Sequence, residues 1–285
     1  MILLNGKEFS LKYRQSLKEK IQVLKEKHGV VPGLAVVIIG EDSASQIYVR
    51  NKIKGAEEVG INSVTVRLSE DISQQEAEKQ VKMLADRDDI DGIIVQLPLP
   101  KKFNTENILK NIPTHKDVDG LCAENLGKLL VGEDALVSCT PKGIIELLKG
   151  YGVEFSGKNA VVIGRSNMVG KPISALLLQE NCTVTICHSK TKNLEFYTKN
   201  ADIVVAAIGK AKFVTENMVK EGAIVVDVGI NRVDGKIYGD VDFDAVSTKS
   251  SMITPVPGGV GPMTVTMLLS NDYIACLRNK KIEEI

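Results

Sequence analysis

The chain has 285 residues, a length that predicts two compact units rather than one. Hydrophobic residues make up 44% and charged residues 25%, the balance of an ordinary globular protein. Basic and acidic residues number 36 each, so the net charge favours binding neither to nucleic acid nor to an anionic membrane.

The cysteines and the amino terminus indicate a cytoplasmic protein. The five cysteines are odd in number and form no C-x-x-C pair, which favours a reducing compartment over a disulfide framework. The apolar run at the start is too short for a secretory signal. No stretch approaches the ~20 apolar residues that span a bilayer. We therefore expect neither a membrane nor a nucleic acid as a partner.

Short apolar runs alternate with amphipathic stretches in the first half, the pattern of βαβ units and a parallel sheet. In chain order we expect a strand at 34–39, a helix at 43–59 ended by Gly60, a strand at 63–67, a helix at 73–85 and a strand at 92–96. Ser73 and Glu76 have the spacing of a capping box at the start of the second helix. Pro98 and Pro100 stop the third strand.

The second half repeats the alternation. A helix at 141–149 joins the halves, strands follow at 160–163, 183–187, 203–208 and 223–228, and helices are expected at 170–179 and 263–278. Pro172 suits the first turn of its helix. The fold class is therefore α/β, with two α/β domains around a cleft.

The strand at 160–163 runs directly into Gly164-Arg-Ser-Asn-Met-Val-Gly170 and then a helix. A dinucleotide fold binds its pyrophosphate at such a turn, on backbone N–H groups at the helix start. The spacing departs from G-x-G-x-x-G, because Ser166 takes the second glycine position and Gly170 comes one residue late. A glycine turn without a ligand is the ordinary alternative. The strand–turn–helix context favours a Rossmann-like domain at 139–262, with residues 1–138 and a final helix at 263–285 forming the other domain.

The end of the next strand indicates which dinucleotide binds. An NAD site usually carries a carboxylate there for the ribose hydroxyls. This strand ends in Cys187-His-Ser-Lys190, without one. Arg165, Ser189 and Lys190 would instead suit a 2′-phosphate. The alternative is that Arg165 is a solvated surface residue. We expect NADP.

Tyr48 and Lys52 stand four residues apart on a predicted helix and so share one face. A desolvated lysine loses its proton readily, and a phenol can orient it. A solvated helix face is the ordinary alternative. Short-chain dehydrogenases use the same spacing, but their tyrosine follows the nucleotide turn, whereas Tyr48 precedes Gly164. Gln96, at the carboxyl end of its strand, is placed either to meet a ligand or merely to end an edge strand.

Two further segments have the composition of possible binding sites. Asp117-Val-Asp119-Gly120 has the composition of a turn, and a calcium loop fails because Cys122 and Lys128 stand where glycine and glutamate are required. The three histidines are scattered, so we expect no metal. Residues 255–262 place three glycines among three prolines. We expect them to form an irregular backbone that lies flat against a ligand ring, with an ordinary loop as the alternative.

Together these segments resemble the bifunctional methylenetetrahydrofolate dehydrogenase/cyclohydrolase family. The matching segments run in family order along nearly the whole chain: 48–52, 95–99, 116–120, 139–143, 164–172 and 255–264. Ser138 departs from the family, which commonly has proline before Cys-Thr-Pro. Serine in place of proline reduces at most the local rigidity of the backbone in this segment between the domains.

The resemblance implies an activity. The enzyme would oxidise 5,10-methylenetetrahydrofolate with NADP and hydrolyse the methenyl product to 10-formyltetrahydrofolate, in one-carbon metabolism and purine biosynthesis. Residues 1–138 would then form the folate-binding catalytic domain. The family is typically a homodimer.

The resemblance also implies roles for individual residues. Lys52 would be the general acid/base, oriented by Tyr48 and Gln96, while Asp119 would grip the pterin. Further residues would contact the ligands: Gly164, Arg165 and Ser166 the dinucleotide phosphates, Ser189 the 2′-phosphate, Ile230 the nicotinamide side, and Pro257, Gly258 and Gly261 the folate.

Two other functions are compatible with the residues alone. A shikimate-type NADP dehydrogenase would use Lys52 as acid/base toward a small hydroxy acid. A non-catalytic folate- or nucleotide-binding protein would keep the binding segments, and the presence of Lys52 speaks against it.

Overall fold

The computed structural model describes residues 1–283, and the chain divides into two compact units. Unit 1 comprises Met1–Leu11, Leu129–Glu133 and Thr140–Thr264. Unit 2 comprises Lys12–Lys128, Asp134–Cys139 and the chain from Val265 onward. Among the described residues, no helix has both the length and the apolar character needed to cross a bilayer.

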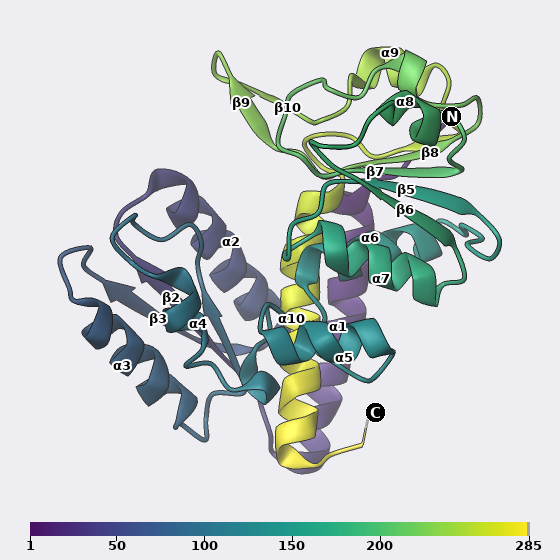
Figure 1. Ribbon diagram of the computed structural model, residues 1–285. Helices are drawn as coiled ribbons and strands as arrows, with labels where there is room; N and C mark the ends of the chain where they lie inside the picture. Colours follow the sequence, from purple (N-terminus) through teal and green to yellow (C-terminus); the bar gives the residue numbers. More distant parts are fainter. Residues whose placement is uncertain (284–285) are drawn as a thin grey trace. The chain divides into compact units, whose positions relative to one another are not determined.

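Unit 2 is built on a three-stranded parallel sheet in the order β3-β2-β4 (Figure 1). Its strands are β2 (Gly33–Ile39), β3 (Asn62–Leu68) and β4 (Gly92–Val95). Every residue of β2 is buried, as expected for a parallel strand covered on both faces. On one face Ala35, Val37 and Ile39 join a hydrophobic core with the buried side of α3 (Gln74–Ala85).

Helices α2 and α3 of unit 2 begin and end within one residue of the predicted positions. Asp42 caps α2 (Ser43–Val59) by accepting a 2.7 Å hydrogen bond from the Ser45 N–H, and Gly60 ends that helix in the left-handed conformation. Ser73 caps α3 by accepting a 3.1 Å hydrogen bond from the Glu76 N–H. The smaller elements are α4 (Thr105–Leu109), the 3₁₀ helix η1 (Thr114–Lys116) and α5 (Ala123–Val131), whose last residues belong to unit 1.

Unit 1 contains a six-stranded, entirely parallel sheet in the order β1-β11-β8-β7-β5-β6. The strands are β1 (Ile2–Leu3), β5 (Asn159–Ile163), β6 (Thr183–Cys187), β7 (Ile203–Ala206), β8 (Ile224–Asp227) and β11 (Met252–Ile253). The helical elements are α6 (Cys139–Gly150), α7 (Gly170–Gln179), α8 (Leu194–Thr198), η2 (Glu216–Met218) and α9 (Phe243–Ser247). An antiparallel hairpin joins β9 (Asn231–Val233) to β10 (Lys236–Tyr238). The sheet order is that of an open α/β fold of the Rossmann type.

Two long helices contribute to both units, α1 (Gly6–His28) and α10 (Val260–Lys280). Neither α1 nor β1 was expected from the sequence. Because β1 pairs with β11, the first eleven residues lie in unit 1, and the domain boundaries at residues 138 and 262 stay a prediction.

Two predicted boundaries were also wrong. The strand at 203–208 ends at Ala206, since the N–H groups of residues 208–210 bond the Asp240 carboxylate instead of a strand. The segment 255–262 is irregular only as far as Gly259. Helix α10 starts at Val260 and holds Pro262 in its first turn, where a missing N–H costs nothing.

Candidate functional site

A buried lysine–glutamine hydrogen bond forms the centre of the candidate site in unit 2. Helix α2 carries Lys52, whose Nζ donates to Gln96 Oε1 at 2.8 Å. Gln96 directly follows β4 and anchors itself by donating from Nε2 to the Leu97 carbonyl at 2.6 Å. Both side chains are only 8% exposed. The structure thus joins two predicted residues that are 44 positions apart in the chain.

The surroundings of Lys52 favour proton exchange. Burial lowers the pKa of the Lys52 ammonium, and this effect outweighs the opposing charges of Asp119 and Cys139. A lowered pKa makes the neutral amine more accessible near neutral pH. That is the property required of a lysine acting as general base and then as general acid.

Asp119 lies within electrostatic reach of Lys52. Desolvation raises the pKa of the Asp119 carboxyl, as does the neighbouring Asp117, while Lys52 lowers it. Asp117 itself has a structural role. Its carboxylate accepts hydrogen bonds from the Cys122 N–H at 2.8 Å and from Asn125 Nδ2 at 3.1 Å. The turn expected at 117–120 is therefore held by Asp117, and Asp119 is the carboxylate near Lys52.

Cys139 and Asn271 support this site. No role for either residue was expected from the sequence. The Cys139 thiol donates to the Val118 carbonyl at 3.3 Å. Asn271, fully buried on α10, donates from Nδ2 to the carbonyls of Val118 at 2.9 Å and Val137 at 2.8 Å. Both residues thus hold the backbone next to Asp119. A polar residue inside an apolar helix was the available signal for Asn271.

Tyr48 lies one helical turn before Lys52 and is 41% exposed. The hydrogen bond that Lys52 donates goes to Gln96, so an orienting role for Tyr48 stays a prediction.

The turn after β5 in unit 1 is packed too closely for side chains at its glycines. Gly164 has φ +129°, and a Cβ there would collide with the Ala207 carbonyl. A Cβ at Gly170 would collide with the Gly164 carbonyl. Ser166, at the second glycine position, accepts hydrogen bonds from the N–H groups of Val169 at 3.1 Å and Gly170 at 3.3 Å. The chain therefore forms a tightly packed turn at the start of α7.

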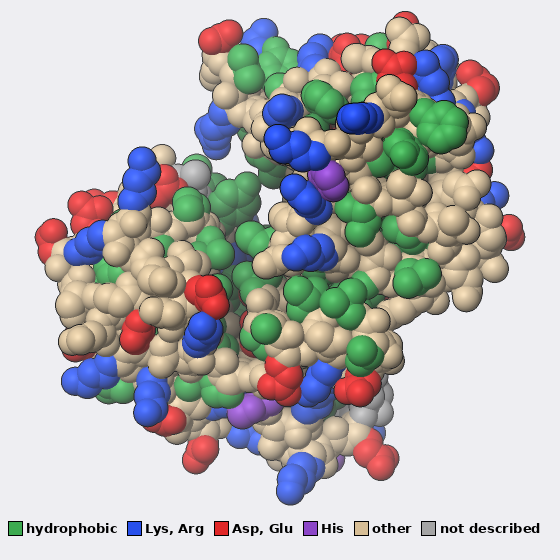
Figure 2. All heavy atoms as spheres, in the orientation of Figure 1, with side chains coloured by type: hydrophobic (Ala, Val, Ile, Leu, Met, Phe, Trp, Pro, Cys, Tyr) green, Lys and Arg blue, Asp and Glu red, His purple; other side chains and the backbone are tan. Residues whose placement is uncertain are grey.

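The turn after β6 contributes hydroxyl and cationic groups. His188 fixes its shape, since the Lys190 N–H donates to His188 Nδ1 at 3.1 Å. Ser189 and Lys190 are exposed in this turn, as are Arg165 and Ser166 in the preceding one. Lys and Arg side chains gather on the visible face of unit 1 in Figure 2. This arrangement has the chemistry that a phosphate requires.

Two more predicted residues of unit 1 are neighbours. Ile230, which follows β8 and is 49% exposed, has its Cδ1 only 3.9 Å from where a Cβ on Gly261 would lie. Gly258 holds the start of α1, because its carbonyl accepts a 2.9 Å hydrogen bond from the Lys7 N–H. Pro257, beside Gly258, follows a cis peptide bond.

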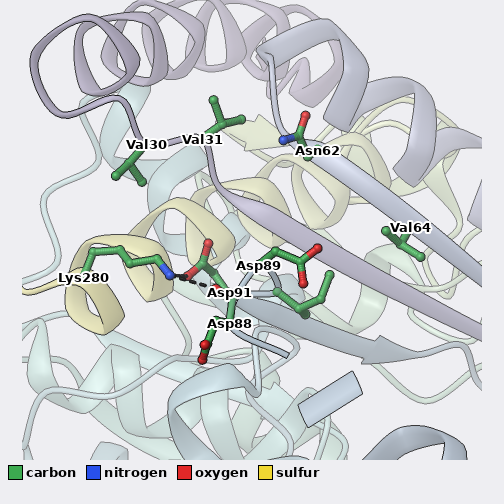
Figure 3. A pocket seen from close by; sticks show the side chains of 9 residues that line it. Val30, Val31, Asn62, Val64, Asp88, Asp89, Asp91 and Lys280 are labelled. Carbon is green, nitrogen blue, oxygen red and sulfur yellow. Dashed lines mark hydrogen bonds and ion pairs between the residues drawn. The ribbon is translucent and has the colours of Figure 1, made fainter. Parts of the chain in front are cut away.

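A separate pocket lies at the amino ends of the strands of unit 2, away from Gln96. Asp88, Asp89, Asp91 and Lys280 line it (Figure 3). Lys280 Nζ donates to the Asp88 carbonyl at 2.8 Å and lies 3.9 Å from Asp91 Oδ1. These contacts tie the end of α10 to the turn before β4, and none of the predicted site residues takes part.

Behind this pocket, Asp272 of α10 is fully buried near Asp91. Neither of its carboxyl oxygens has a hydrogen-bond partner among the described residues. Desolvation, with the charge of Asp91, raises the pKa of Asp272 well above the usual carboxyl range.

Comparison with known proteins gives matches along nearly the whole chain. Residues 4–119 match the catalytic domain of tetrahydrofolate dehydrogenase/cyclohydrolase, and residues 138–280 match its NAD(P)-binding domain. The bifunctional protein FolD of Campylobacter concisus is 57% identical over 276 residues, covering 96% of this chain and 97% of the relative.

Solved structures agree with these matches. The bifunctional FolD methylenetetrahydrofolate dehydrogenase/cyclohydrolase of Campylobacter jejuni has a TM-score of 0.95 and 49% identity, covering 98% of this chain and 99% of that one. The Trypanosoma brucei enzyme, solved with NADP and an inhibitor, has a TM-score of 0.94 and 35% identity over 99% of both chains. Identity at this level decides against the shikimate-type alternative. The chain belongs to the tetrahydrofolate dehydrogenase/cyclohydrolase family.

Proposed function

We propose that this chain oxidises 5,10-methylenetetrahydrofolate to 5,10-methenyltetrahydrofolate with NADP and then hydrolyses the product to 10-formyltetrahydrofolate. The observation that carries the proposal is the buried Lys52–Gln96 hydrogen bond with Asp119 nearby. The same two activities are named for the Campylobacter jejuni relative, and NADP is bound in the Trypanosoma brucei structure.

Lys52 is the general acid/base of the hydrolytic step. Addition of water to the methenyl cation releases one proton and leaves a hydroxyl group on the one-carbon unit. Opening of the ring then gives a proton to the departing nitrogen, while that hydroxyl loses its own proton to solvent as the formyl C=O forms. A neutral Lys52 amine can take the first proton and deliver the second. Burial of Lys52 makes that neutral form accessible, and the hydrogen bond to Gln96 keeps Nζ in one place. Tyr48, on the same helix face, assists in orienting Lys52.

Asp119 holds the pterin. The ring N–H and the adjacent amino group of a pterin are two donors side by side, and a carboxylate offers two acceptor oxygens in matching positions. Val118, next to Asp119, is fixed by Cys139 and Asn271, so the carboxylate is presented from a rigid backbone. Preorganised donors and acceptors of this kind bind with little further ordering cost.

The cofactor binds in unit 1, where the residues fit a dinucleotide. Gly164 and Gly170 let strand, turn and helix pack closely against one another, and the start of α7 suits a pyrophosphate. Arg165 and Ser166 hold the phosphates, and Arg165 reaches the 2′-phosphate together with Ser189. Bound NADP accepts the hydride that leaves the one-carbon bridge. Further contacts come from residues on the nicotinamide and folate sides: Ile230, Pro257, Gly258 and Gly261.

We further propose that the enzyme works as a homodimer in the cytoplasm and supplies a one-carbon donor for purine biosynthesis. A reducing location is supported by the cysteines, all five of which are thiols in the structure.

The test is a coupled assay on the purified chain. Methylenetetrahydrofolate is supplied with NADP⁺ or NAD⁺, and the absorbances of reduced cofactor and of methenyltetrahydrofolate are followed together, with 10-formyltetrahydrofolate measured by chromatography. We expect reduction of NADP⁺ first and formyl product second, with slower reduction of NAD⁺. Absence of cofactor reduction with either dinucleotide would refute the proposed function.

A further inference from the structure

A buried carboxylate fills a cradle of backbone N–H groups at the carboxyl end of β7. Asp240, fully buried, accepts hydrogen bonds from three consecutive residues: Ile208 at 2.7 Å, Gly209 at 2.9 Å and Lys210 at 2.8 Å. Consecutive N–H groups of this kind form an anion-binding site. Here the anion is a side chain of the protein, so the cradle fixes the loop that follows β7.

Asp240 fixes a second loop at the same end of the sheet. Its Oδ1 accepts a 2.9 Å hydrogen bond from Asn231 Nδ2. Gly229 packs directly on the carboxylate, since a Cβ at Gly229 would collide with Asp240 Oδ1. Ile230 lies between these two residues. The position of Ile230 therefore depends on a side chain that the β9–β10 hairpin brings back to the sheet.

A second buried carboxylate holds Asp240 in place. Asp227, the last residue of β8, accepts from the N–H groups of Asp240 at 2.8 Å, Val241 at 2.9 Å and Gly229 at 3.0 Å. Desolvation raises the pKa of Asp227 to about 6 against these hydrogen bonds. The protonation state of Asp227 therefore changes within the usual assay range. Asp240 is the residue to test, because its carboxylate bonds both loops directly.

The carboxyl ends of β7 and β8 belong to the edge at which open α/β sheets bind their ligands. We propose that Asp240 is a positioning residue for hydride transfer, which sets the places of Ile230 and of residues 208–210 beside the cofactor. This inference rests on the proposed function. Asp240 acts through the two loops and does not itself touch the reacting atoms.

The test variant is Asp240→Asn, which keeps the shape of the side chain but turns one acceptor oxygen into a donor that faces backbone N–H groups. Asp242→Asn is the matched control, because Asp242 lies two residues on and pairs only with Lys212 among the described residues, at 3.0 Å. Asn231→Ala removes one of the four hydrogen-bond donors to the Asp240 carboxylate, and so disturbs the contact between Asp240 and the loop after β8 more mildly.

Three measurements are compared across these proteins. Hydride transfer is followed in single turnovers at saturating NADP⁺, with protium or deuterium on the one-carbon bridge. Hydrolysis is measured on supplied methenyltetrahydrofolate without NADP, which reports on Lys52 in unit 2. Amide hydrogen exchange at residues 208–210 and 229–231 is measured without cofactor.

We expect Asp240→Asn to slow hydride transfer by about 10–100-fold, since a displacement on the order of 1 Å at reacting atoms costs up to about 100-fold. Hydrolysis should stay within about twofold, exchange at the two loops should speed up, and Asp242→Asn should match the wild type. Asn231→Ala should change transfer and exchange in the same direction by less. Should Asp240→Asn fail to fold, Asn231→Ala decides the question by the same criteria.

Two results would overturn the inference. One is unchanged hydride transfer or unchanged loop exchange in folded Asp240→Asn. The other is an equal loss of hydride transfer and of hydrolysis, which indicates general destabilisation. A wild-type protein that reduces no NADP⁺ would instead contradict the proposed function.

Discussion

Replacement of Lys52 by glutamine separates the two reactions proposed for this enzyme. Glutamine roughly keeps the length of the side chain and a polar end that can still meet Gln96. It cannot exchange a proton at neutral pH. Hydride transfer moves no proton to or from the protein, whereas addition of water and ring opening both do. The variant should therefore lose hydrolysis and keep measurable oxidation.

The size of the effect follows from what Lys52 contributes. General acid–base catalysis is typically worth about 10²–10⁴-fold, or about 3–5 kcal/mol of activation free energy. A poorer hydrogen bond from the new glutamine to the buried Gln96 Oε1 costs at most a further ~0.5–1.5 kcal/mol of local ordering. The weaker hydrogen bond to Gln96 slows both reactions, whereas the loss of acid–base catalysis slows only hydrolysis.

Stopped-flow absorbance measures both steps in one trace. In the wild type, methenyltetrahydrofolate should form and decay, while in Lys52→Gln it should accumulate. Lys54→Gln is the matched control, since Lys54 is exposed on the same helix, and it should behave as the wild type. If a folded Lys52→Gln protein slows both steps by the same factor, Lys52 is a binding or structural residue and not the acid/base.

Three further predictions concern binding and stability. Arg165→Ala should weaken NADP⁺ binding by about 1.5–3 kcal/mol and NAD⁺ binding much less, measured by titration; equal losses would contradict the 2′-phosphate assignment. Asp119→Asn places a donor against the donors of the pterin, so both activities should fall together; an unchanged folate affinity at equilibrium would exclude this role. Asp272→Asn should stabilise the fold increasingly as the pH rises above the ordinary carboxyl range. The raised pKa of Asp272 means that the folded chain retains a proton that the unfolded chain releases, and this costs at most about 1.4 kcal/mol per pH unit. A thermal-melting difference that does not change with pH would contradict the assignment.

Much of the fold was predictable because its signals are local. The buried run of β2, the Ser73 cap and the glycine turn at 164–170 each depend on a few neighbouring residues. Strand β1 has two residues and pairs with β11, far along the chain, so no local pattern marks it.

The candidate site divides in the same way. Lys52 and Gln96 were marked by helix spacing and by the end of a strand, and the structure joins them. Asn271 and Asp240 act through backbone groups distant in sequence, which only the folded chain brings near. Residues that support a site through such contacts have no fixed spacing, and this is why sequence patterns miss them.

The pairing of β1 with β11 has a consequence for biosynthesis. Ile2 leaves the ribosome 250 residues ahead of its strand partner Met252. Unit 2 likewise needs a segment made late in synthesis, because Asn271 of α10 donates hydrogen bonds to the carbonyls of Val118 and Val137. Each unit can complete these contacts only once its late segment has been made, β11 in unit 1 and α10 in unit 2. Cutting the gene near residue 139 would therefore not yield two independently folding halves.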